Sequence, residues 1–136
     1  MSVAGPLTLF DLAQRGMSAQ LVRMNAAASN LANAGTVSGS EDQTYRPIRA
    51  VFAEELDQRT GLSTVRVAAV QRENAAAVRQ HNPDHPLADA EGNVRSSPVD
   101  ESAEMVEMLE SARQYQNLVE ALSTAKQLML DTMRLR

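Results

Sequence analysis

The sequence contains no cysteine and no tryptophan, and it has only two phenylalanines and two tyrosines. The absence of cysteine excludes disulfide bonds and thiolate metal sites. Because aromatic side chains are so few, the apolar residues that remain are mainly Ala, Val, Leu and Met. These residues suit helix seams, where Ala permits close approach and Met adapts to an irregular partner surface. The 136 residues are enough for one modest domain.

The sequence also lacks a basic patch and a long apolar run. The formal net charge is −4, and the thirteen basic residues, all but one of them Arg, are scattered along the chain. This charge balance argues against nucleic acid as a partner. The chain does not open with a basic segment followed by an apolar run, and no apolar stretch is long enough to cross a bilayer. We therefore expect neither a cleavable signal peptide nor membrane insertion.

What the sequence does contain is a long amphipathic stretch, residues 97–136, which has no Gly. Its start, Ser97-Pro98-Val99-Asp100, offers a capping side chain, a proline suited to the first helical position and an acidic first turn. This pattern predicts one helix of roughly 55 Å, longer than a small domain is wide. Apolar residues follow it in steps of three and four, a coiled-coil spacing interrupted at Lys126. They are Met105, Met108, Ala112, Tyr115, Val119, Leu122, Met129 and Met133.

A second amphipathic stretch lies near the N-terminus, where Thr8 and Asp11 form a capping pair. The pattern predicts a helix that ends at about Asn33. Gly16 costs such a helix up to about 1 kcal/mol relative to Ala, which indicates a close helix contact at that position. The stripe is rich in Ala, so we expect the terminal helices to be only marginally folded without neighbours. Its residues are Phe10, Ala13, Met17, Leu21, Met24, Ala28 and Leu31.

The middle of the chain has strand and turn signals. Residues 62–71 are rich in Val and Thr and alternate in polarity, which predicts a strand with one covered face. Residues 75–81 are expected to return antiparallel to it after a turn at Glu73-Asn74. Residues 45–56 begin extended, since Pro47 disfavours a helix there, and are then ambiguous between helix and strand. A turn-rich connector leads from this hairpin to the long helix.

These patterns together predict a mainly α fold. The long N- and C-terminal helices, within residues 1–36 and 97–136, are expected to pair as a coiled-coil-like bundle and to form one terminal helical domain. Residues 37–96 are expected to form a small β-hairpin and loop region between them.

Two separated blocks of the sequence resemble the axial proteins of bacterial flagella, which build the rod and hook. In the first block, Ser29-Asn30-Leu31-Ala32-Asn33 matches the Ser-Asn-Ile/Leu-Ala-Asn signature of those proteins. The second block, residues 82–94, is similar to the Asp-Pro-x-His-Pro-x-Ala-Asp-x-x-Gly-x-Val connector of proximal-rod subunits. His81 and Asn82 depart from the pattern, since the family tends to have an aromatic and an acidic residue there.

The resemblance implies a structural subunit of the proximal rod of the basal body, without a cofactor. Such subunits are exported through the flagellar type III apparatus without a cleavable signal peptide. They assemble through their terminal helices into the tubular drive shaft that transmits torque across the periplasm. The implied partners are copies of the chain itself, neighbouring proximal-rod and distal-rod proteins, and rod-base, export-gate or MS-ring components.

The helical stripes and the resemblance together give a set of expected subunit-interface residues. Composition alone assigns the two asparagines of the first block to helix termination, whereas the resemblance implies a positioning role at a subunit contact. The expected interface consists of Phe10, Met17, Leu21, Met24, Asn30, Leu31, Asn33, Met105, Met108, Tyr115, Val119, Leu122, Met129 and Met133.

Other classes of function fit parts of the sequence. A metal-dependent enzyme can be imagined from His81 and His85, four residues apart, with Asp84 and Asp89. Pro83 disfavours the helix that this spacing needs, and loop hydrogen bonds account for both imidazoles. No nucleophile with a positioned base is visible, so we expect no enzyme activity and no metal site.

A soluble coiled-coil adaptor or secretion chaperone shares the helical spacing, and it is expected to be a stable, folded dimer in isolation. An interfacial membrane helix is disfavoured, because the acidic start of the long helix opposes anionic lipid.

Overall fold

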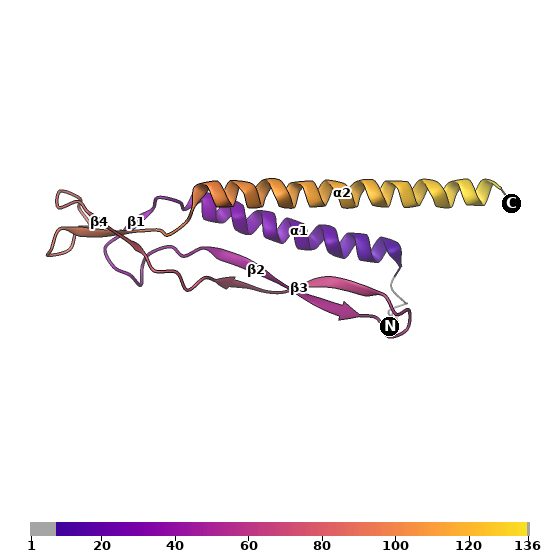
Figure 1. Ribbon diagram of the computed structural model, residues 1–136, viewed down its shortest axis with the longest axis horizontal. Helices are drawn as coiled ribbons and strands as arrows, with labels where there is room; N and C mark the ends of the chain where they lie inside the picture. Colours follow the sequence, from indigo (N-terminus) through magenta and orange to yellow (C-terminus); the bar gives the residue numbers. More distant parts are fainter. Residues whose placement is uncertain (1–7, 136) are drawn as a thin grey trace.

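The computed structural model describes residues 8–135 as an elongated molecule with three layers along the length of its shorter helix (Figure 1). Helix α1, Leu9–Ala32, forms the middle layer. The longer helix α2, Glu101–Arg134, runs antiparallel along one side of α1 and continues past the N-terminal end of α1. A two-stranded sheet lies along the other side of α1. The outermost parts of the expected helical domain, residues 1–7 and 136, lie outside the described residues.

Five strands in two antiparallel sheets connect the helices within the described residues. Strands β2, Ile48–Leu56, and β3, Ser63–Arg72, form the hairpin that covers α1. The second sheet lies at the end of the molecule where α1 finishes and α2 begins (Figure 1). Its strand order is β1, Val37–Ser38, then β5, Asn93–Ser96, then β4, Val78–His81.

The prediction of a mainly α fold with a small hairpin is wrong, although the two terminal helices are present as expected. The β region makes two sheets, and the fold combines helix and sheet layers. The strand expected at residues 62–71 exists as β3, but it pairs with β2, whereas the segment expected to pair with it forms β4 and pairs with β5. Alternating polarity identifies a strand without naming its partner, and here the partner precedes β3 in the chain.

Both ends of the β2–β3 hairpin are closed by backbone hydrogen bonds. At the tip, the Asp57 N–H donates to the Leu62 carbonyl at 2.8 Å, and Gly61 adopts a positive φ of 71° that favours glycine. At the open end, the Glu73 N–H donates to the carbonyl of Pro47 at 2.8 Å. Pro47 therefore precedes a strand, which agrees with its preference for extended neighbours.

Helix α1 begins as the sequence predicts. The Asp11 N–H donates to the Thr8 hydroxyl at 3.2 Å, and the Thr8 N–H donates to the Asp11 carboxylate at 2.9 Å, which completes a capping box. The Thr8 backbone hydrogen bond also lowers the pKa of the Asp11 carboxyl. The helix ends where Asn33 caps its last turn, as expected.

Helix α2 begins later than predicted, and its cap is Asp100, whose carboxylate accepts from the Ala103 N–H at 3.3 Å. The prediction of Ser97 as the cap is wrong. Ser97 is buried and holds the chain before the helix: its hydroxyl donates to the Tyr45 carbonyl and its N–H to the Thr36 carbonyl, both at 3.0 Å.

The apolar core is thin, because the helix that lies between the other two layers carries small side chains. The buried apolar residues of the described part are Ala13, Ala19, Ala26, Ala27 and Val94. At Gly16 an added Cβ would lie 3.0 Å from the Leu118 Cδ1, so this glycine permits a close helix contact, as the sequence indicated. Burying Ala removes little apolar surface from water, at about 25 cal/mol per Å², so polar contacts must help to join the layers.

Candidate assembly surface

Helix α2 has two contact stripes along its length, which we call seams. One row of residues, the shared line, belongs to both. The seam toward α1 places Glu104, Ser111, Leu118 and Ala125 at intervals of seven. The shared line, also at intervals of seven, is Met108, Tyr115, Leu122 and Met129. Alternating steps of four and three between the two lines give the heptad pattern of paired helices. Within the subunit, then, α1 covers only one side of the shared line.

The second seam of α2 is the side that the described residues leave uncovered. Val119 is 43% exposed, Met105 57% and Met133 69%. We call Met105, Val119, Met129 and Met133 the outer seam. Val106, Leu109 and Leu128 are also exposed. The heptad spacing does not identify them, because they lie beside the apolar stripe rather than in it. Exposed apolar side chains gathered on one element mark a contact surface.

The structure places the expected interface residues at three levels of burial. Five are exposed: Leu21, Met105, Val119, Met129 and Met133. Eight are half-buried: Phe10, Met17, Met24, Leu31, Asn33, Met108, Tyr115 and Leu122. One, Asn30, is completely buried inside the subunit.

Asn30 joins α1 to the start of β2. Its amide nitrogen donates to the Ile48 carbonyl at 3.0 Å, and its side-chain oxygen accepts from the Ile48 N–H at 2.9 Å and from the Tyr45 hydroxyl at 2.8 Å. Asn33 makes a more local contact, since its amide donates to the Ser29 carbonyl one turn earlier at 2.9 Å. The two asparagines of the sequence motif therefore differ, because the first fixes a strand and the second closes the helix.

Two arginines hold the layers together near the same end of α1. Arg49 of β2 pairs with Glu104 of α2 and donates through Nε to Glu73 at 2.7 Å. Arg23 of α1 makes a two-bond contact with Glu107 of α2, at 2.7 and 2.9 Å. The hydrogen bonds from Arg23 lower the pKa of the Glu107 carboxyl. Charge-assisted bonds of this geometry are stronger than neutral ones.

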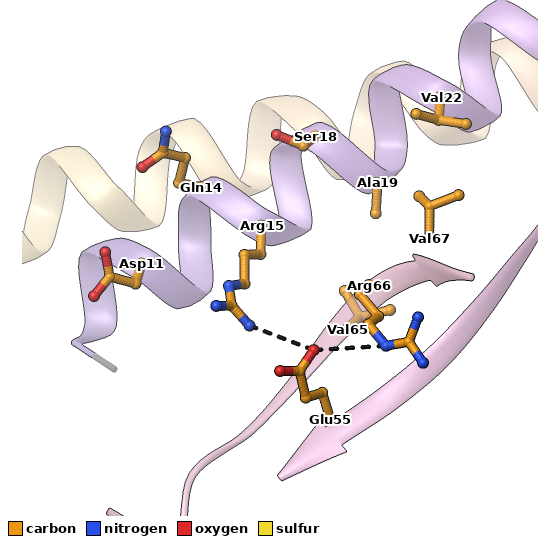
Figure 2. A pocket seen from close by; sticks show the side chains of 10 residues that line it. All are labelled: Asp11, Gln14, Arg15, Ser18, Ala19, Val22, Glu55, Val65, Arg66 and Val67. Atoms are coloured by element: carbon orange, nitrogen blue, oxygen red, sulfur yellow. Dashed lines mark ion pairs between the residues drawn. The ribbon is translucent and has the colours of Figure 1, made fainter. Parts of the chain in front are cut away.

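A groove of about 580 Å³ lies between α1 and the hairpin (Figure 2). Ala19 and Val22 of α1 face Val65 and Val67 of β3 across it. At one side, Glu55 lies 3.7 Å from Arg15 and 3.6 Å from Arg66, as the dashed lines in Figure 2 show. Exposed pairs of this kind contribute at most about 1 kcal/mol.

The histidines considered as metal ligands bond to nearby groups, His81 across the β4–β5 pair and His85 within the connecting turn. The His81 Nδ1 lies 3.2 Å from the Asn93 side-chain oxygen, and the Leu87 N–H donates to the His85 Nδ1 at 3.0 Å. Across residues 8–135, no three His, Asp or Glu side chains gather as a metal-binding group. No described helix combines the length and apolar character needed to cross a membrane.

Comparison with known proteins matches both helical parts of the chain. Residues 10–38 match the family described as flagella basal body rod protein, and residues 90–135 match the C-terminal family of the flagellar basal body rod FlgEFG proteins. The chain is 42% identical over 131 residues to the flagellar basal-body rod protein FlgC of Salmonella typhimurium, covering 95% of this chain and 96% of the relative. The protein of the same name from Yersinia enterocolitica is 44% identical over 131 residues, with the same coverage. That from Agrobacterium fabrum is 28% identical over 127 residues, covering 91% of this chain and 90% of the relative.

Proposed function

Since the chain belongs to the FlgC family of flagellar basal-body rod proteins and is a structural subunit of the rod, we propose that it assembles into the proximal rod through the outer seam of α2. The observation that supports this proposal is that α1 covers only one side of the shared line and leaves the outer seam exposed. Helix α2 has 34 residues and α1 has 24, so the last turns of α2 extend past the N-terminal end of α1. A neighbouring subunit supplies the missing cover.

A repeating contact of this kind suits a tube. In the proposed contact the outer seam meets a different surface of the neighbouring subunit. Such a contact is heterologous, and heterologous contacts generate rings or helical filaments. In the proposed arrangement the terminal helical domain, residues 1–36 and 97–136, forms the inner wall and residues 37–96 face outward. Partners are other copies and neighbouring rod and basal-body proteins, and the assembly transmits torque without chemistry of its own.

The thin core supports export as an unfolded chain. Ordering a residue costs roughly 1–2 kcal/mol, and a core built largely of Ala offsets this only narrowly. A subunit of this kind unfolds easily for passage through the type III apparatus, which uses no cleavable signal peptide, and reaches its full stability in the periplasmic rod, where neighbours cover its seams.

The test compares Val119→Asp with Glu120→Gln in a strain that lacks the native subunit. In the free protein Val119→Asp should cost less than about 0.5 kcal/mol, since the side chain is substantially exposed. In the rod the carboxylate would enter an apolar contact, at a cost of several kcal/mol.

We expect an exported subunit that is absent from basal bodies, and non-motile cells, for Val119→Asp only. The Glu120→Gln strain should swim and contain normal rods. Normal rods built from the Val119→Asp protein would show that this side of α2 makes no essential contact.

A further inference from the structure

A buried carboxylate on α2 is neutralised by an arginine from the hairpin. Glu104 is only 1% exposed, and both of its oxygens accept hydrogen bonds from the guanidinium of Arg49. Arg49 also binds Glu73, which directly follows β3. One arginine therefore connects the start of α2 to both strands of the hairpin.

The contact between Arg49 and Glu104 joins the hairpin to a helix that does not lie beside it. Among the described residues, the strands β2 and β3 run beside α1 and not beside α2, because α1 lies between the hairpin and α2 (Figure 1). The position of Arg49 is set by its neighbour Ile48, whose N–H and carbonyl are both bound by Asn30. Arg49 is thus placed by α1 and reaches α2.

A buried ion pair contributes little to stability compared with apolar side chains of the same size, but removing one partner is strongly destabilising. The uncompensated carboxylate of Glu104 then remains in a buried site. Glu104 is an unpaired buried charge whenever α2 lies against α1 and the hairpin is not docked. The pair of Arg23 and Glu107 differs, because it joins the two helices without the hairpin.

We infer that Arg49 is a positioning residue that makes closure of α2 onto α1 depend on docking of the hairpin. With Arg49 in place, Glu104 is paired and the first turns of α2 can close. Without it, closure buries a lone carboxylate, and the first turns of α2 open. The inference goes beyond the proposed function, because it concerns how one subunit orders its own helices and not which surface meets a neighbour.

The experiment measures amide hydrogen exchange in the full-length monomer with Arg49→Met, with Arg49→Met combined with Glu104→Met, and with Arg66→Met as the matched control. Arg66 is an exposed hairpin arginine, and among the described residues it pairs with the exposed Glu55. Arg49→Met should lower protection in residues 101–111 by about 100-fold, although the substituted residue is on the hairpin. The double variant should restore protection there, since no charge is left to neutralise. Arg66→Met should leave it unchanged.

Two results would overturn the inference. Parent-like protection of residues 101–111 in the Arg49→Met protein would show that closure does not need the hairpin. Equal loss in the single and double variants would show that side-chain packing, and not the unpaired charge, is responsible. If Arg49→Met does not fold, Glu104→Gln decides: it should keep the helix protected while the hairpin exchanges faster, and an unprotected helix would refute the dependence.

Discussion

Replacing Asn30 with Ala should cost the free subunit about 3 kcal/mol of unfolding free energy. The side chain is completely buried and makes three hydrogen bonds, two with the backbone of Ile48 and one with the Tyr45 hydroxyl. Each such bond contributes about 0.5–1.5 kcal/mol net, so the three together contribute about 1.5–4.5 kcal/mol. Alanine also leaves the N–H of Ile48 without its partner at the edge of the hairpin, which adds a desolvation cost.

The matched control is Asn33→Ala in the same motif. Asn33 is half-buried, and its side chain makes one bond to a carbonyl in its own helix, so its loss should cost less than about 1 kcal/mol. Urea unfolding of both variants, followed by circular dichroism at a helical wavelength, gives the two free energies. Equal losses of unfolding free energy for Asn30→Ala and Asn33→Ala would refute the role of Asn30 in holding the start of β2. Loss of motility without loss of monomer stability in Asn30→Ala would instead support a direct subunit contact.

Three further predictions concern the helix pair. Gly16→Ala should be more favourable by about 1 kcal/mol in a Leu118→Ala background than in the parent, because the new Cβ meets Leu118; a double-mutant cycle without coupling would refute that contact. Because Arg23 lowers the pKa of Glu107, the pair stabilises the fold above the unfolded value of 4.5, and this contribution is lost as the pH falls through the lowered pKa. The unfolding free energy should therefore fall less steeply with decreasing pH in Arg23→Gln than in the parent. An identical pH dependence in the two proteins would show that the pair of Arg23 and Glu107 does not stabilise the fold. Limited proteolysis of the monomer should first trim the helix ends farthest from the second sheet, since few contacts offset their ordering cost, and uniform resistance in a verified monomer would contradict marginal folding.

The helices were predictable from the sequence because their signals are local. The capping box at Thr8 and the contact indicated by Gly16 are both present. The choice of seam was less predictable. The stripe of apolar residues includes Met105 and Val119, which α1 leaves exposed, whereas Glu104 and Ser111 face α1 and are buried. Because the first two positions of this seam are a glutamate and a serine, they give no hydrophobic signal, and the periodicity of apolar residues cannot reveal them.

The β region was less predictable, because its pairing depends on contacts distant in sequence. β3 shows clear alternation, but what holds its partner β2 is Asn30, a helix residue 18 positions before Ile48. Arg49 and Glu104 are 55 positions apart, and nothing in their local sequences relates them. Local patterns define elements, whereas buried polar contacts decide how the elements are joined.

The central claim is that the outer seam of α2 becomes buried in the rod, and cysteine labelling tests it most directly. The native chain has no cysteine, so Val119→Cys gives a single reactive thiol. Glu120→Cys, on a neighbouring exposed position, reports whether the reagent reaches the rod at all. Maleimide labelling is compared between the free subunit and purified basal bodies. The account predicts that Val119→Cys reacts readily in the free subunit and is protected in the basal body, while Glu120→Cys reacts in both; equal labelling of Val119→Cys in the two states would contradict it.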